Sequence, residues 1–177
     1  MTSTKLRKLI PSLTIALGAV FTGLTSLVPG QGNDQIKTVV DSGKIQNLLK
    51  LSTTGNGYSE ETILVFIPEA TWGFDPLYDA YKLQGSNAAP QIYSIIPGSN
   101  LSINAMPSIL INLVVQLGYK VGVLNNYTIT ASQFMSFDPS VSIYLEDTKD
   151  NVFIDIKANP VYNFVASPSD NIQRFRL

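Results

Sequence analysis

The chain has 177 residues, of which 45% are hydrophobic and 14% are charged, so one domain with a substantial core is expected and disorder over the whole length is not. A net charge of -1 without a long basic run argues against a nucleic-acid partner, because phosphate binding depends on clustered lysine and arginine. The absence of Cys and His excludes disulfides, thiol nucleophiles, histidine metal ligands and histidine acid–base catalysis.

The N-terminal segment has the pattern of an export signal. Three basic residues, Lys5, Arg7 and Lys8, precede an uncharged and largely apolar stretch that ends at Gly30. Such a pattern predicts that residues 1–30 are a signal peptide. Two alternatives stay open. The stretch approaches the roughly 20 residues that cross a bilayer, which would make it an uncleaved anchor, or it is a core segment of a truncated domain.

The rest of the chain is expected to form one β-domain over residues 47–177, after a polar linker over residues 31–46. An apolar run at 62–67 predicts a strand that is buried on both faces. Further short runs alternate between apolar and polar residues, and turn-forming residues such as Pro97-Gly98 separate them. These alternating runs are 101–105, 117–123, 127–131, 141–145, 152–156 and 162–166.

This pattern predicts an all-β fold, an antiparallel β-sandwich of the jelly-roll or immunoglobulin-like kind. Residues 109–117 are mostly apolar and fit either a buried strand or a short helix.

The segment 72–83 concentrates aromatic and acidic residues. Trp72, Tyr78 and Tyr81 suggest a platform on which sugar rings stack. Asp75 and Asp79 suggest oxygen ligands for Ca²⁺, or the two carboxylates of a glycoside hydrolase.

The simpler interpretation, which we favour, is a structural loop. In it the aromatic rings pack on the core edge, and Asp75 and Asp79 accept hydrogen bonds from backbone N–H groups of the loop. The prediction therefore includes no catalytic residue, no metal and no cofactor.

A second acidic cluster contains Glu146, Asp147 and Asp150. It lies between two predicted strands, which indicates an exposed hairpin tip. No glycine-rich loop leads into a Lys-Ser or Lys-Thr helix start, and without histidine a Ser-His-Asp arrangement cannot exist.

From about Leu49 to its end the chain resembles a region of large secreted proteins of Bacteroidetes, which precedes the C-terminal sorting domain of the type IX secretion system. Motifs in the same order carry this resemblance, each of them weak alone. They are Gly55-Asn56-Gly57-Tyr58, Gly73-Phe74-Asp75, Tyr78-Asp79-Ala80-Tyr81-Lys82, Ala89-Pro90-Gln91-Ile92-Tyr93, Leu101-Ser102-Ile103-Asn104, Leu117-Gly118-Tyr119-Lys120-Val121-Gly122, Tyr127-Thr128-Ile129-Thr130-Ala131, Tyr144-Leu145-Glu146-Asp147 and Lys157-Ala158-Asn159-Pro160.

The resemblance implies an all-β accessory module of a bacterial surface or secreted protein, and it implies no catalytic residues. In that family the sorting domain would begin after Leu177, beyond this sequence. We therefore expect a non-enzymatic accessory or adhesive module, extracellular or at the cell surface. Its expected partners are other domains of a surface protein or a polysaccharide, and a membrane only through the N-terminal segment. The alternative is a carbohydrate-binding module that serves an enzyme encoded elsewhere.

Overall fold

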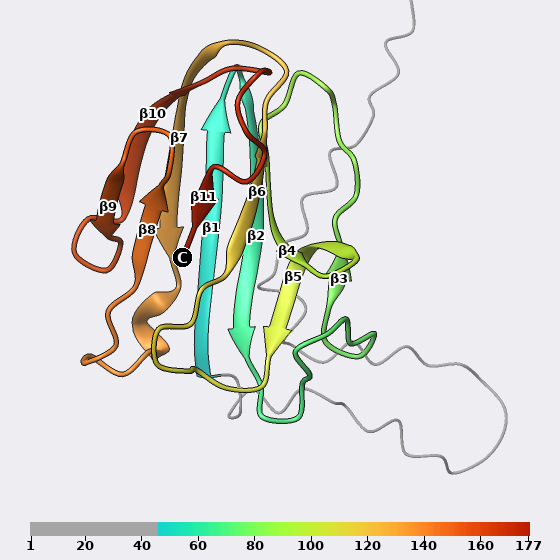
Figure 1. Ribbon diagram of the computed structural model, residues 1–177, viewed down its shortest axis with the longest axis vertical. Coiled ribbons are helices and arrows are strands. Elements are labelled where there is room, and N and C mark those ends of the chain that lie inside the picture. Colours follow the sequence, from blue (N-terminus) through green and yellow to red (C-terminus); the bar gives the residue numbers. More distant parts are fainter. Residues whose placement is uncertain (1–45) are drawn as a thin grey trace, which may run out of the picture. The chain divides into compact units, whose positions relative to one another are not determined.

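The computed structural model describes residues 46–177, which form one curled sheet (Figure 1). Its strands are β1 (Gln46–Gly55), β2 (Tyr58–Phe66), β3 (Ala80–Tyr81), β4 (Gln91–Ile96), β5 (Ser99–Met106), β6 (Gln116–Lys120), β7 (Asn125–Ser132), β8 (Tyr144–Asp147), β9 (Val152–Asp155), β10 (Val161–Ala166) and β11 (Phe175–Arg176). One 3₁₀ turn, η2 (Phe134–Ser136), follows β7. The prediction of an all-β fold is confirmed.

The strands lie in the order β10-β7-β1-β2-β5-β4-β6-β11-β8-β9, and β3 pairs with β5 off this path. The pair β2 and β5 is parallel, while the other pairs are antiparallel, so the sheet is mixed. The sandwich arrangement, jelly-roll or immunoglobulin-like, stays a prediction. The signal or anchor at 1–30 and all of the linker except Gln46 lie outside the described residues.

Within residues 46–177, no helix is long and apolar enough to cross a membrane.

Tight turns set the register of the two longest hairpins. Asn56 and Gly57 have φ angles of 52° and 76°, which match the turn type that suits the twist of paired strands, so Gly55 lies opposite Tyr58. Gly98 has a φ of 79° in the predicted turn between β4 and β5. Both turns place a residue without a Cβ where the backbone needs a positive φ.

Strand β2 is buried on both faces, as its apolar run predicts. Leu64 belongs to the main core, whereas its neighbour Val65 packs with Ala70 and Ala105 in a second, smaller cluster. This placement follows from the strand period of two, which sends adjacent side chains to opposite faces.

The curl of the sheet brings strands from its two halves face to face. Tyr119 of β6 lies against Phe164 of β10, with ring centroids 5.2 Å apart, and its hydroxyl is 2.9 Å from the hydroxyl of Thr53 on β1. Phe175 of β11 packs edge-on against Phe164, at 4.9 Å between centroids. The main core therefore lies between the halves, and the short strand β11 contributes directly to it.

Candidate functional site

A buried arginine fixes the last strand in place. The guanidinium of Arg174 is only 1% exposed and donates to both carboxylate oxygens of Asp147, at 2.8 and 2.5 Å. It also donates to Asp150 at 2.8 Å, to Asp170 at 3.1 Å and to the carbonyl of Val165 at 2.7 Å. All three guanidinium nitrogens therefore have hydrogen-bond acceptors, and a buried charge is tolerated only when it is paired in this way.

The aromatic rings and the Tyr162 hydroxyl complete this cluster. The guanidinium lies 4.9 Å from the ring centroid of Phe164, and Tyr162 donates to Asp147 at 2.9 Å. Burial alone would raise the pKa of Asp147, but the hydrogen bonds from Arg174 and Tyr162 outweigh it and hold that pKa below its ordinary value. Burial, together with the bond to Asp147, raises the pKa of the Tyr162 hydroxyl. The cluster therefore keeps Asp147 ionised, as a structural anchor.

Strand β11 lies between β6 and β8 and pairs with both. Phe175 lies opposite Leu117 of β6 and opposite Asp147 of β8. The pairing with the β6 side continues one residue further, because Leu177 and Val115 exchange two backbone hydrogen bonds. On the β8 side the pairing ends at Arg176 and Glu146.

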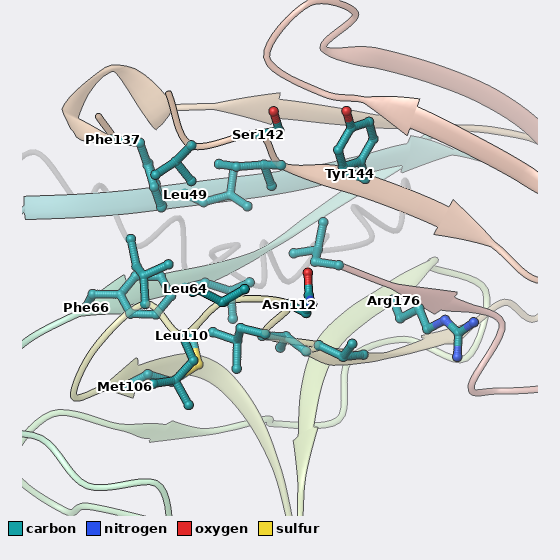
Figure 2. Close-up of a pocket in the computed structure, with 18 of the residues that line it drawn as sticks. Leu49, Leu64, Phe66, Met106, Leu110, Asn112, Phe137, Ser142, Tyr144 and Arg176 are labelled. Carbon is teal, nitrogen blue, oxygen red and sulfur yellow. The ribbon is translucent and has the colours of Figure 1, made fainter. Parts of the chain in front are cut away.

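An apolar groove of about 860 Å³ is lined in part by Arg176 and Leu177 at the end of β11 (Figure 2). Its floor is the main core, including Leu49, Leu64 and Met106, and its walls are the segments 109–115 and 140–144. Figure 2 shows Leu110 and Asn112 on one wall and Ser142 and Tyr144 on the other. The groove thus reaches down to residues of the main core, which are themselves almost fully buried.

The charged end of the groove is an ion pair between Arg176 and Glu146. The guanidinium donates to both carboxylate oxygens of Glu146, one of them at 2.7 Å. The hydrogen bond from Arg176 lowers the pKa of Glu146. Hydroxyls of Ser140, Ser142 and Tyr144 add polar groups at the rim. The groove therefore offers apolar walls with a polar border, a combination typical of binding sites.

The three aromatic residues suggested as a sugar platform are not all exposed. Trp72 and Tyr81 are 47% and 54% exposed, so the expectation that the aromatic rings of this segment are buried is wrong for these two. Tyr81 stacks on Phe74, with centroids 4.1 Å apart, and this contact covers one ring face. Tyr78 packs against the smaller core cluster. Tyr81 belongs to β3, a two-residue strand that pairs only with β5 in the described part of the chain.

The two candidate calcium ligands are engaged in backbone hydrogen bonds. Asp79 accepts from the N–H of Asp75 and from the N–H of Ala105 in β5, both at 2.7 Å. Asp75 accepts from Leu77 at 3.0 Å. The prediction that both carboxylates bond to N–H groups of their own loop is confirmed, and Asp79 in addition ties this loop to the sheet. Residues 46–177 contain no group of three or more acidic side chains that could hold a metal ion.

The second acidic cluster does form the hairpin between β8 and β9, but it is not simply an exposed tip. Asp147 is buried against Arg174, Glu146 pairs with Arg176, and Asp150 is the only one of the three that is largely exposed. The prediction failed for Asp147 because its partner lies 27 residues further along the chain.

Sequence reasoning also missed the groove. Residues 109–117 were expected to be a buried strand or a short helix, whereas residues 109–115 form an irregular wall and only Gln116 and Leu117 belong to a strand, β6. Leu110 and Ile111 are exposed large hydrophobic residues. The signal in the sequence was an apolar run that does not alternate with polar residues, as a half-buried strand would, and that is too short for a typical helix.

Comparison with known proteins gives a family. A family model described as a domain of unknown function, DUF8693, matches residues 35–177. No curated protein and no solved structure matches the chain. Because the family match covers well over half of the sequence, the chain belongs to the domain family of unknown function DUF8693.

Proposed function

We propose that the chain is a non-catalytic accessory module of an exported or cell-surface protein, and that it docks another polypeptide in its apolar groove. The groove carries this proposal. Its walls include half-exposed or exposed large hydrophobic residues, among them Leu110, Ile111 and Val114, next to a floor that is the protein core. A contiguous apolar surface of this kind, rimmed by polar groups, is typical of an interaction site.

Three of the carboxylates support a non-catalytic role by what they bond. Both oxygens of Asp79 and of Asp147 accept hydrogen bonds from structural donors, and Asp75 accepts one within its own loop. A general acid or base needs a carboxyl that is free to exchange a proton with substrate. The export part of the proposal rests on the basic residues and the apolar stretch before Gly30.

The test compares Leu110→Asn with Leu83→Asn, a matched substitution at an exposed leucine outside the groove. An apolar fluorescent dye, anilinonaphthalene sulfonate, is titrated into the folded protein. We expect saturable binding by the wild type and by Leu83→Asn, and loss of binding in Leu110→Asn. Equal binding of the dye by all three proteins would show that the groove is not the apolar binding site. Turnover in a panel of glycoside, ester and peptide substrates, if Asp75→Asn or Asp79→Asn abolished it, would overturn the non-catalytic role.

A carbohydrate-binding module is the second candidate, and the exposure of Trp72 and Tyr81 favours it. Trp72 is the single tryptophan of the chain, so its fluorescence reports on this surface alone. A saturable change on addition of a polysaccharide, absent in Tyr81→Ala, would support sugar stacking. An unchanged spectrum across a broad panel would refute it.

A further inference from the structure

The two walls of the groove, 140–144 and 109–115, are held by different contacts. On the 109–115 side, Leu113 donates its N–H to the carbonyl of Leu110 at 3.2 Å. Within residues 46–177 no hydrogen bond joins one wall to the other. The width of the groove therefore depends on how each wall is fixed to the rest of the fold.

Only the end of the wall 140–144 belongs to a strand, because β8 begins at Tyr144. The segment before it, 138–143, is a turn followed by irregular backbone. Its last residue is fixed by the bond from the Ile156 N–H to the Ile143 carbonyl, at 3.0 Å. The rest of the segment has no strand ladder to hold it, so its position depends on other contacts.

The turn at the start of this segment is held locally by Asp138. Its carboxylate accepts from the N–H of Ser140 at 2.8 Å and from the Ser140 hydroxyl at 2.6 Å. Its carbonyl accepts from the N–H of Val141 at 3.0 Å. These bonds stabilise the turn in the way that an Asp at the first position of a turn commonly does, but they do not connect the turn to the sheet.

The ammonium group of Lys157 makes that connection. It donates to the carbonyls of Asp138 at 3.1 Å, Pro139 at 3.2 Å and Val141 at 2.6 Å. A lysine ammonium has three N–H donors, so these three carbonyls engage all of them. Within residues 46–177 the carbonyls of Pro139 and Val141 accept no other hydrogen bond. Lys157 is therefore the contact that ties the turn to the β9 side of the fold.

The backbone of Lys157 is itself held in place directly after β9. Its N–H donates to the carboxylate of Asp155 at 2.9 Å, and the same oxygen accepts from the N–H of Ala158 at 3.3 Å. The preceding residue, Ile156, makes the backbone bond to Ile143 of the wall. The lysine side chain therefore extends from an ordered turn that lies beside the wall.

We propose that Lys157 is a positioning residue for the groove, whose ammonium group fixes the wall 140–144 relative to the wall 109–115 and thereby sets the affinity of the site. Lys157 does not line the groove, so it acts through the wall and not by touching the occupant. This inference rests on the proposed function and adds what controls that site. Without the ammonium group the wall would have to be ordered when the occupant binds, and such ordering costs binding free energy.

The chain contains no cysteine, so Lys157→Cys introduces a single thiol that can be alkylated in urea before refolding. Bromoethylamine rebuilds a side chain with an ammonium group, and bromoethane supplies nearly the same stem without it. Lys120→Cys, treated in the same two ways, is the control at an exposed lysine outside the groove. Two quantities are measured: binding of the uncharged apolar dye Nile red, and NMR relaxation order parameters of the Ser140 and Ser142 amides.

We expect the ammonium form of Lys157→Cys to bind the dye with wild-type affinity. The ethyl form should bind it at least about tenfold more weakly and should show lower order parameters at Ser140 and Ser142. Lys157→Met, which needs no refolding, should behave as the ethyl form does. Because the dye carries no charge, the loss of the lysine charge does not act on it directly. Both forms of Lys120→Cys should match the wild type.

The outcomes separate this inference from the proposed function. Unchanged order parameters in the ethyl form and in Lys157→Met would overturn the inference alone. Equal dye affinity in the ammonium and ethyl forms would do the same, because the ammonium group would then not set the affinity. Failure of the wild type to bind Nile red would also overturn the inference, and failure to bind anilinonaphthalene sulfonate as well would overturn the proposed function with it.

Discussion

Leu177 and Val115 exchange two backbone hydrogen bonds, with N···O distances of 2.8 and 3.0 Å. Both residues also line the apolar groove, so the end of β11 lies at the candidate binding site. The same strand whose Phe175 packs in the main core therefore also contributes to the lining of the groove.

The Arg174 cluster should be the main anchor of β11. Replacing Arg174 with Met would leave Asp147 buried without its charge partner, so we expect a loss of about 3–5 kcal/mol in the free energy of unfolding. Arg176→Met is the matched control at an exposed ion pair, and its loss should be far smaller. Urea denaturation measures both. Similar losses for the two variants would contradict the anchoring role of Arg174.

Acid should weaken the same cluster. The folded-state pKa values of Asp147 and Asp170 lie below the ordinary value, so their stabilisation is present above about pH 4 and is lost as the pH falls through the lowered values. Glu60, whose pKa burial raises, acts in the opposite direction. Urea denaturation between pH 3 and pH 7 should show a steep fall for the wild type. In Asp147→Asn this fall should be shallower, and an identical slope would disprove the contribution of Asp147.

The loop 72–83 should depend on Asp79 more than on Asp75. Asp79→Ala removes the acceptor for Ala105 and for the Asp75 N–H, so a loss of about 1–3 kcal/mol is expected, whereas the exposed bond from Leu77 to Asp75 is worth less. Thermal denaturation of the two variants gives the comparison. Added Ca²⁺ or soluble sugar should leave the melting temperature unchanged. A calcium-dependent rise that Asp79→Ala removed would instead identify a metal site.

The strand pattern of the fold was predictable because alternation depends on local sequence. The runs around Ile103, Ile129 and Phe164 became β5, β7 and β10, and the apolar run at Leu64 became a strand buried on both faces. The ion-pair cluster was not predictable, because Arg174 meets Asp147 only once β11 pairs with β8, which precedes it by 27 residues at this contact. The groove was missed for a related reason, since the apolar residues around Leu110 give the same pattern in a groove wall as in a core.

The most direct measurement is an NMR titration of the isotope-labelled protein with the amphipathic peptide acetyl-Thr-Val-Thr-Leu-Thr-amide, which follows the methyl groups of Leu110, Ile111 and Val114 in the groove. The account predicts saturable shifts at these methyl groups in the wild type and in Leu83→Asn, and their loss in Leu110→Asn. Binding that is the same in Leu110→Asn as in the wild type would contradict the assignment of the groove as the docking site.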